Sequence, residues 1–155
     1  MKKIITVLFL LFVISCAHGG KLAQGCETID GEEYCMVSMV SLIANPDRYD
    51  KTKIIVTGYY KTEMEMSGLF LTEDHAQIED YSNAIWVSYN KDSTLALAKT
   101  KDNTWKEWVS DLVDGSTARN NYVRIVGIFR AGPAGHFGVY QGEISEVPGF
   151  SVKSK

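Results

Sequence analysis

The pattern of apolar and polar positions predicts a mainly β domain with a few short helices. Three segments rich in β-branched and aromatic residues, at 53–61, 69–72 and 84–89, are predicted as strands 1 to 3. Two further segments, at 122–130 and roughly 136–147, are predicted as strands 4 and 5. Most of the connections carry turn-forming glycine, proline, asparagine or aspartate, as expected for short strands.

A short helix is predicted in front of strand 1. It must end near Asn45-Pro46, because the residue before a proline disfavours the α conformation. Its apolar positions recur at i, i+3, i+4 and i+7, a spacing that places them on one core-facing stripe. The members of this stripe are Met36, Met39, Val40 and Ile43.

A second helix is predicted between strands 3 and 4. Thr104 and Glu107 form a capping box, in which each side chain bonds an exposed backbone amide of the first turn. Gly115 stands just past the predicted end, where a left-handed cap is expected. The apolar face of this helix consists of Trp105, Trp108, Val109 and Leu112.

Three strands, a helix and two strands is the element order of the OB-fold, a five-stranded Greek-key barrel. Strands 1 and 4 also resemble each other, since each has a central glycine followed by two bulky residues and a basic one. We interpret Gly58 and Gly127 as bend points, because a small closing barrel requires strongly coiled strands. The predicted fold is therefore mainly β: an OB-fold-like barrel with a helix between strands 3 and 4 and a short N-terminal helix.

The chain begins with a segment typical of exported proteins. A basic start, Met1-Lys2-Lys3, is followed by the apolar residues 4–14, interrupted only by Thr6, and then by small residues. A helix over this apolar run would cover only about half of a hydrocarbon core roughly 30 Å thick. We therefore predict a signal peptide at 1–15 rather than a membrane span.

The junction Val13-Ile14-Ser15-Cys16 resembles a bacterial lipobox, the motif whose cysteine becomes the acylated N-terminus. We therefore predict lipid attachment, palmitate included, at Cys16. Acyl chains contribute about 0.8 kcal/mol per buried methylene, and two or three of them hold a protein at a bilayer. Ala17 follows where an inner-membrane retention signal usually has Asp, which by resemblance to Gram-negative lipoproteins indicates the outer membrane. Ordinary cleavage after Ser15 or Ala17 is the alternative.

Lipidation of Cys16 leaves Cys26 and Cys35 as a pair. The turn signal Asp30-Gly31 between them would bring their two segments together. We therefore predict a disulfide between Cys26 and Cys35 in an oxidising compartment. A zinc site is the weaker interpretation, because two cysteines without a nearby histidine supply half of the usual ligands.

Composition supports a single globular domain. The chain has 155 residues, 45% of them hydrophobic, which suits one domain with one core. We assign 16–25 to a flexible tether and 26–150 to the domain, including its disulfide-closed N-terminal loop. Without the two leader lysines, 14 basic residues face 19 acidic ones, a net charge of minus five. General nucleic-acid binding is therefore disfavoured unless the fold gathers a local basic patch.

Several motifs together carry a family resemblance. They are Asn45-Pro46-Asp47-Arg48-Tyr49 after the short helix, Ile54-Ile-Val-Thr-Gly58, Asn83-Ala-Ile-Trp86 and Gly138-Val-Tyr-Gln-Gly142. Through them, residues 38–147 resemble a family of small bacterial exported OB-fold-like lipoproteins, some of which are described as nucleic-acid-binding. The resemblance implies an OB-like fold, whereas a function does not follow from a fold. Lys51 stands where this family often has glycine, which costs about 1 kcal/mol if the turn requires a positive φ.

A ligand face on such a barrel requires exposed aromatic rings and, for nucleic acid, basic residues that follow the phosphates. Strand residues alternate between the two faces, so roughly half of the aromatic residues fill the interior. On the paired strands 1 and 4, a basic patch would consist of Lys53, Lys61, Arg124 and Arg130. The candidate ligand face consists of Tyr59, Trp86, Tyr89, Arg124, Arg130 and Tyr140.

No catalytic or metal-binding motif is recognisable in the sequence. It has neither a GxSxG elbow nor a phosphate-binding glycine loop. The acidic residues from Glu73 to Asp80 match no calcium loop, and His18, His75 and His136 form no i, i+4 pair. We therefore expect no catalytic residue, no cofactor and no metal, and we interpret these groups as solvated.

The sequence thus predicts a non-catalytic binding or structural module of the bacterial cell envelope. Its lipid would anchor it to a membrane, the outer membrane facing the periplasm, and its barrel would bind a protein or a small envelope ligand. One alternative is an OB-fold protein that binds single-stranded nucleic acid, with a strong salt dependence. Another is an enzyme with an unrecognised site, which convergent acids with shifted pKa values would indicate.

Overall fold

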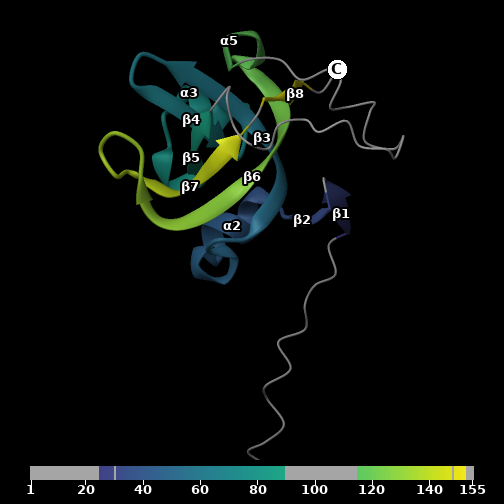
Figure 1. The fold of residues 1–155 in the computed structure, drawn as a ribbon. Coiled ribbons are helices and arrows are strands. Elements are labelled where there is room, and N and C mark those ends of the chain that lie inside the picture. Colours follow the sequence, from purple (N-terminus) through teal and green to yellow (C-terminus); the bar gives the residue numbers. More distant parts are fainter. Residues whose placement is uncertain (1–24, 30, 90–114, 148, 153–155) are drawn as a thin grey trace, which may run out of the picture.

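The computed structural model describes residues 25–29, 31–89, 115–147 and 149–152, which form a mainly β domain (Figure 1). In chain order the elements are β1 (Cys26–Ile29), β2 (Glu32–Met36), α2 (Met39–Ala44), η1 (Pro46–Tyr49), β3 (Lys53–Glu63), β4 (Met66–Phe70), α3 (Glu73–Gln77), η2 (Tyr81–Asn83), β5 (Ala84–Tyr89), α5 (Gly115–Ala118), β6 (Asn121–Ala134), β7 (Tyr140–Val147) and β8 (Ser151–Val152).

Five of the strands close into a barrel. β3, β4, β5, β7 and β6 are hydrogen-bonded in that order, and β6 pairs back onto β3. Neighbouring strands are antiparallel except for β5 and β7, which run parallel. This order is the Greek-key topology of the OB-fold, so the predicted fold class is confirmed.

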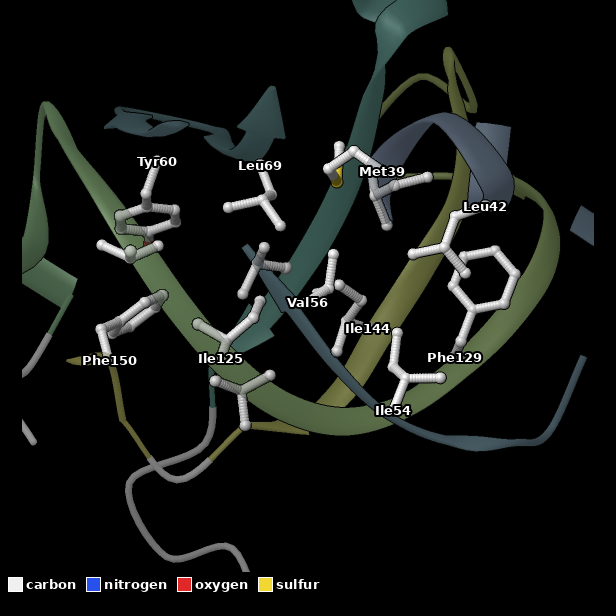
Figure 2. Packing of buried hydrophobic residues seen from close by; sticks show 14 of the residues in the cluster. Met39, Leu42, Ile54, Val56, Tyr60, Leu69, Ile125, Phe129, Ile144 and Phe150 are labelled. Atoms are coloured by element: carbon white, nitrogen blue, oxygen red, sulfur yellow. The ribbon is translucent and has the colours of Figure 1, made fainter. Parts of the chain in front are cut away.

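The barrel interior is one continuous apolar core (Figure 2). Alternate residues of the strands point inward, as the period of two requires. At one end the core is closed by Met39 and Leu42 of α2, which belong to the same buried cluster as Phe129. At the other end Tyr60 packs against Phe150, with ring centroids 4.4 Å apart. Residues that precede the barrel strands in the chain therefore close one opening of the barrel, and Phe150, which follows them, helps to close the other.

Gly58 and Gly127 face the interior, where a neighbouring strand approaches too closely for a side chain. A Cβ atom at Gly127 would stand 2.6 Å from both Ile144 Cγ2 and the Ser145 carbonyl oxygen. A Cβ atom at Gly58 would stand 2.7 Å from Leu69 Cγ. The glycines thus leave room for the side chain opposite, a reason for their presence beyond the bending expected from the sequence.

The N-terminal helix is present, but its buried face differs from the prediction. Met39 and Leu42 are buried, whereas Val40 is 59% exposed. Met36 belongs to β2 and pairs with Ile55 of β3, so the predicted stripe began on a strand. The predicted helical spacing therefore started from Met36, a residue that is in a strand and pairs with β3, and the helix itself begins only at Met39.

The helix predicted from Thr104 to Leu112 lies outside the described residues. The predicted left-handed cap at Gly115 is wrong, because this glycine is part of α5 and has no positive φ. It packs against the end of the core instead, where an added Cβ would stand 3.2 Å from the Tyr60 hydroxyl. Close packing therefore accounts for glycine at this position.

The β1–β2 hairpin covers part of the outer surface of the barrel. Cys26 lies directly opposite Cys35, with the two sulfur atoms at bonding distance, 2.03 Å. The predicted cysteines are therefore a disulfide-capable pair. β2 continues in parallel with β3, and the hairpin buries a second apolar cluster that consists of Ile29, Tyr34, Ile55 and Val126.

The turn in front of β3 requires the positive φ that glycine adopts most easily. Lys51 has a φ of 59°, and its amide donates a hydrogen bond to the Phe129 carbonyl oxygen at 2.7 Å. The turn therefore keeps the shape expected for glycine, and lysine there costs about 1 kcal/mol.

We expect Gly127→Ala to destabilise the protein by about 1 to 3 kcal/mol, because the added methyl group overlaps the backbone of β7. Equilibrium unfolding in denaturant measures this loss. Gly25→Ala is the matched control, since its added Cβ would meet only Met36 Cε at 3.7 Å. Equal stability of the two variants would contradict this account of the packing.

Reduction of the Cys26–Cys35 pair should lower the free energy of unfolding by about 2.5 to 3 kcal/mol, because it releases a short closed loop. The double variant Cys26→Ala, Cys35→Ala should show the same loss without reductant. If that variant unfolds at the same denaturant concentration as the untreated protein, the pair is not a stabilising crosslink.

Candidate functional site

The six residues predicted as a ligand face lie in three regions of the barrel. One region is an aromatic cluster outside β4 and β5, another is the barrel end at Phe150, and the third is the outer face of β6. Tyr59, Trp86 and Tyr140 lie in the first region, Tyr89 in the second, and Arg124 and Arg130 in the third. The structure brings the first three together and leaves the two arginines apart from them, whereas Trp86 and Tyr89 also line one hollow together.

The aromatic cluster is largely covered. Tyr59 and Tyr140 are only 8% and 4% exposed, so their rings do not offer a free face for stacking. Trp86 is partly buried and meets Tyr140 edge to face, with ring centroids 5.3 Å apart. The Tyr59 hydroxyl donates a hydrogen bond to Glu73 Oε1 at 3.3 Å, which ties α3 to β3. Burial, with Glu73 as a second cause, raises the pKa of Tyr59.

The N-terminal hairpin covers the surface of β6 between the two predicted arginines. Arg124 and Arg130 are six positions apart on one face of β6, which separates them by about 20 Å. Val126 lies between them and is buried under the hairpin. Arg124 pairs in register with Thr57, and Arg130 pairs with Glu143. The two guanidinium groups therefore do not belong to one patch.

The two predicted lysines have carboxylate partners. Lys53 Nζ lies 2.8 Å from Glu32 Oε2 of the hairpin. Lys61 Nζ lies 3.3 Å from Glu79 Oε1 and 3.6 Å from Glu63 Oε1. Within the described part of the chain, the four predicted bases thus form no continuous basic groove.

A groove of about 310 Å³ opens between two turns of the barrel. One turn, Met64–Glu65, joins β3 to β4, and the other, 135–139, joins β6 to β7; both project on the left side of Figure 1. These two connections flank the ligand-binding face of OB-folds. We call it the two-turn groove, and its lining consists of Glu63, Met64, Glu65, Met66, Glu79, Tyr81, His136, Phe137, Val139 and Tyr140.

Large apolar side chains project into solvent around the two-turn groove. Met64 is 92% exposed, Phe137 is 78% exposed and Val139 is 42% exposed. A two-residue hairpin turn usually carries glycine, asparagine or aspartate, yet here it is Met64-Glu65, with Glu65 in the left-handed region at a φ of 66°. Neither the exposed methionine nor the strained glutamate helps the fold, which is typical of a functional surface.

The groove carries a surplus of negative charge. Three carboxylates line it, those of Glu63, Glu65 and Glu79, and each side chain is about half exposed or more. Lys61 neutralises part of this charge between Glu63 and Glu79, and its ammonium also donates to a backbone carbonyl of α3. Glu65 Oε2 lies 3.8 Å from His136 Nε2. With a neutral histidine, these groups sum to minus two.

Three of the acidic residues between 73 and 80 serve separate local contacts. Glu73 accepts a hydrogen bond from Tyr59, and Glu79 contacts Lys61. Hydrogen bonds from Ser82 and then Asn83 lower the pKa of the Asp80 carboxyl. Among the described residues of this loop, no three ligand atoms gather as a metal site requires.

Two other hollows lie on the described surface. One, of about 330 Å³, runs beside α2 and is lined in part by Met36, Val40 and Arg124. The other, of about 650 Å³, is lined in part by Trp86 and Tyr89 of the predicted face and by Gly115; Tyr89 and Gly115 adjoin the segment outside the described residues. Neither combines exposed aromatic side chains with a cluster of like charges as the two-turn groove does.

Sequence reasoning missed the two-turn groove because it looked for ligand residues on strands. The sequence places Phe137 in no predicted site, and it indicates only a solvated histidine at His136. Tyr140 is the one member of the predicted face that lines this groove. The available signal was an apolar residue, Met64, in the connection 62–68 between two predicted strands.

Fold and groove together define an OB-fold-like barrel with an acidic, apolar-rimmed groove between two of its turns. Comparison with known proteins yields no match to a family model, a curated protein or a solved structure. The predicted lipid attachment at Cys16 and the signal peptide lie outside the described residues. Among the described helices, none is long and apolar enough to cross a membrane.

Stability should fall at alkaline pH because of Tyr140. Burial raises the pKa of its phenol, with smaller contributions from Tyr81 and Glu79, so the folded state favours the neutral form. This contribution is complete below about pH 10, the ordinary tyrosine value, and is lost as the pH rises towards the folded-state pKa. We expect Tyr140→Phe to lose less stability than the unsubstituted protein above about pH 10 in denaturant titrations. Identical pH dependence of the two would contradict this.

Proposed function

We propose that this protein is a lipid-anchored component of the bacterial cell envelope. Its barrel is a non-catalytic binding module, and the two-turn groove is the surface that binds a partner protein. The observation that carries the proposal is that Met64 on one turn and Phe137 on the other are both exposed and line the same groove. OB-folds bind ligands at this place. Apolar surface of this kind is unfavourable in water and is stabilised when a partner covers it.

The anchor is supported by the leader sequence. The basic start, the apolar run and the lipobox-like junction at Cys16 favour acylation, and Ala17 favours the outer membrane. A tether at 16–25 would span at most about 35 Å when extended, since a residue reaches roughly 3.5 Å. Such a tether would keep the barrel near the membrane while leaving its grooves accessible to proteins in the periplasm.

A binding role rather than an enzymatic one is supported by the titratable groups. Among the described residues, the groups with clearly shifted pKa values are Tyr59, Asp80, Tyr81 and Tyr140. The tyrosine shifts come first from burial, and the Asp80 shift comes first from local hydrogen bonds. Each shift thus has a local structural cause, burial or hydrogen bonding, and this supports a binding role.

Nucleic-acid binding is the alternative, and the electrostatics of the groove disfavour it. A strand of phosphates would approach Glu63, Glu65 and Glu79, whose charges repel it. Exposed aromatic rings for stacking are few here, because Tyr59 and Tyr140 are buried.

Photo-crosslinking in living bacteria tests the proposal. We expect a photoreactive phenylalanine analogue at Phe137 to form a discrete protein adduct that sediments with membranes. The same analogue at Val40, which is 59% exposed on α2, is the matched control and should form no such adduct. In a Cys16→Ser background the protein should leave the membrane fraction.

Other outcomes would contradict specific parts of the proposal. An adduct at Val40 alone would place the binding surface beside α2. A nuclease-sensitive adduct at Phe137 would favour the nucleic-acid alternative. Membrane association that survives Cys16→Ser would exclude the lipid as the anchor.

A further inference from the structure

We propose that the two-turn groove recognises a cationic, apolar segment of its partner, in which lysine or arginine stands next to a large apolar side chain. This inference rests on the proposed function of the groove and adds the chemistry of the partner. It is carried by the way in which carboxylates and exposed apolar side chains alternate along the groove.

The carboxylates of the groove are incompletely neutralised by the protein itself. Lys61 is held in place, because its ammonium bonds the Ala76 carbonyl oxygen at 3.2 Å and its side chain is only 15% exposed. Its positive charge therefore neutralises part of the charge of Glu63 and Glu79 and is not paired with Glu65. Glu65, with 63% of its side chain exposed at the tip of the turn, is the carboxylate best placed to meet a cation from outside.

The exposed apolar side chains of the groove indicate that the cation it binds belongs to a segment that also carries apolar side chains. Met64 immediately precedes Glu65, and Phe137 immediately follows His136, so on both turns an exposed apolar residue stands next to a polar one, and on the first turn that polar residue is a carboxylate. An ammonium or guanidinium group at Glu65 would place a neighbouring side chain against Met64 or Phe137. A guanidinium can also stack on the Phe137 ring, which is worth about 0.5 to 1 kcal/mol at exposed sites.

Size and charge exclude the other obvious occupants. At about 310 Å³ the groove is at the small end of ligand pockets, which suits a few side chains of a peptide. The excess of carboxylates repels nucleic acid and anionic lipid surfaces. A second copy of this chain is disfavoured for the same reason, because the domain is itself acidic.

Binding of synthetic peptides to the full chain in non-ionic detergent tests the inference. The probe is a fluorescein-labelled peptide of alternating arginine and leucine. Two comparison peptides replace its arginines by glutamate or its leucines by serine. We expect the arginine–leucine peptide to bind most tightly, with an affinity that falls as salt increases.

Substitutions assign this binding to the groove. Glu65→Gln and Met64→Ser should each weaken it about two- to fivefold, the range expected for one exposed contact. Glu33→Gln is the control, because it removes the same charge from an exposed position on β2, and it should leave the affinity unchanged. Both groove positions are exposed turn residues, so circular dichroism should show folded variants.

The contrary outcomes separate the inference from the proposed function. If the glutamate–leucine peptide binds as tightly and Met64→Ser weakens it, the groove binds apolar segments but the cationic preference is wrong. If Glu65→Gln and Glu33→Gln weaken binding equally, or neither groove variant has an effect, the peptide binds elsewhere and the inference is overturned. Absence of binding by all three peptides overturns the inference, and crosslinking at Phe137 then decides the proposed function.

Discussion

Closure of the barrel by the β3–β6 pairing is the constraint on which the rest of the structure depends. Without it, the sheet would present two long unpaired edges, which tend to associate with other chains. Gly58 lets β4 approach β3 closely and Gly127 lets β7 approach β6 closely, because a side chain at either position would collide with that neighbouring strand. β3 and β6 then run on beyond this pairing, and the turns at their ends meet, as the 3.8 Å contact of Glu65 with His136 shows.

Two coverings of the outer surface decide where a ligand can bind. The β1–β2 hairpin covers the middle of β3 and β6 and separates Arg124 from Arg130. The segment with α3 and η2 covers the aromatic cluster around Tyr59. Of the hollows named above on the described surface, the two-turn groove is the one that combines exposed apolar side chains with a cluster of carboxylates, and it lies between turns rather than on a strand face.

The fold could be predicted from sequence because its signals are local and repetitive. Each signal can be read from a short stretch of sequence. The signals are the alternation of apolar and polar residues in the strands, the glycine in each of β3 and β6, and the Cys26–Cys35 pair. The prediction that Met36 belongs to the helix was wrong, because helical periodicity does not show that this residue pairs with β3, a strand further along the chain. The candidate site was predicted only at Tyr140. Burial of Tyr59 depends on long-range packing under α3, and the acidic surroundings of Glu65 arise from segments far apart in sequence.

The methionine methyl groups offer the most direct measurement of where this barrel binds. Met64 and Met66 line the two-turn groove, whereas Met36 and Met39 line the hollow beside α2. In full-length protein labelled with ¹³C at these methyl groups, NMR spectra recorded while an arginine–leucine peptide is added report both places at once. The account predicts that the Met64 and Met66 signals shift and the Met36 and Met39 signals do not. Shifts confined to Met36 and Met39 would contradict it.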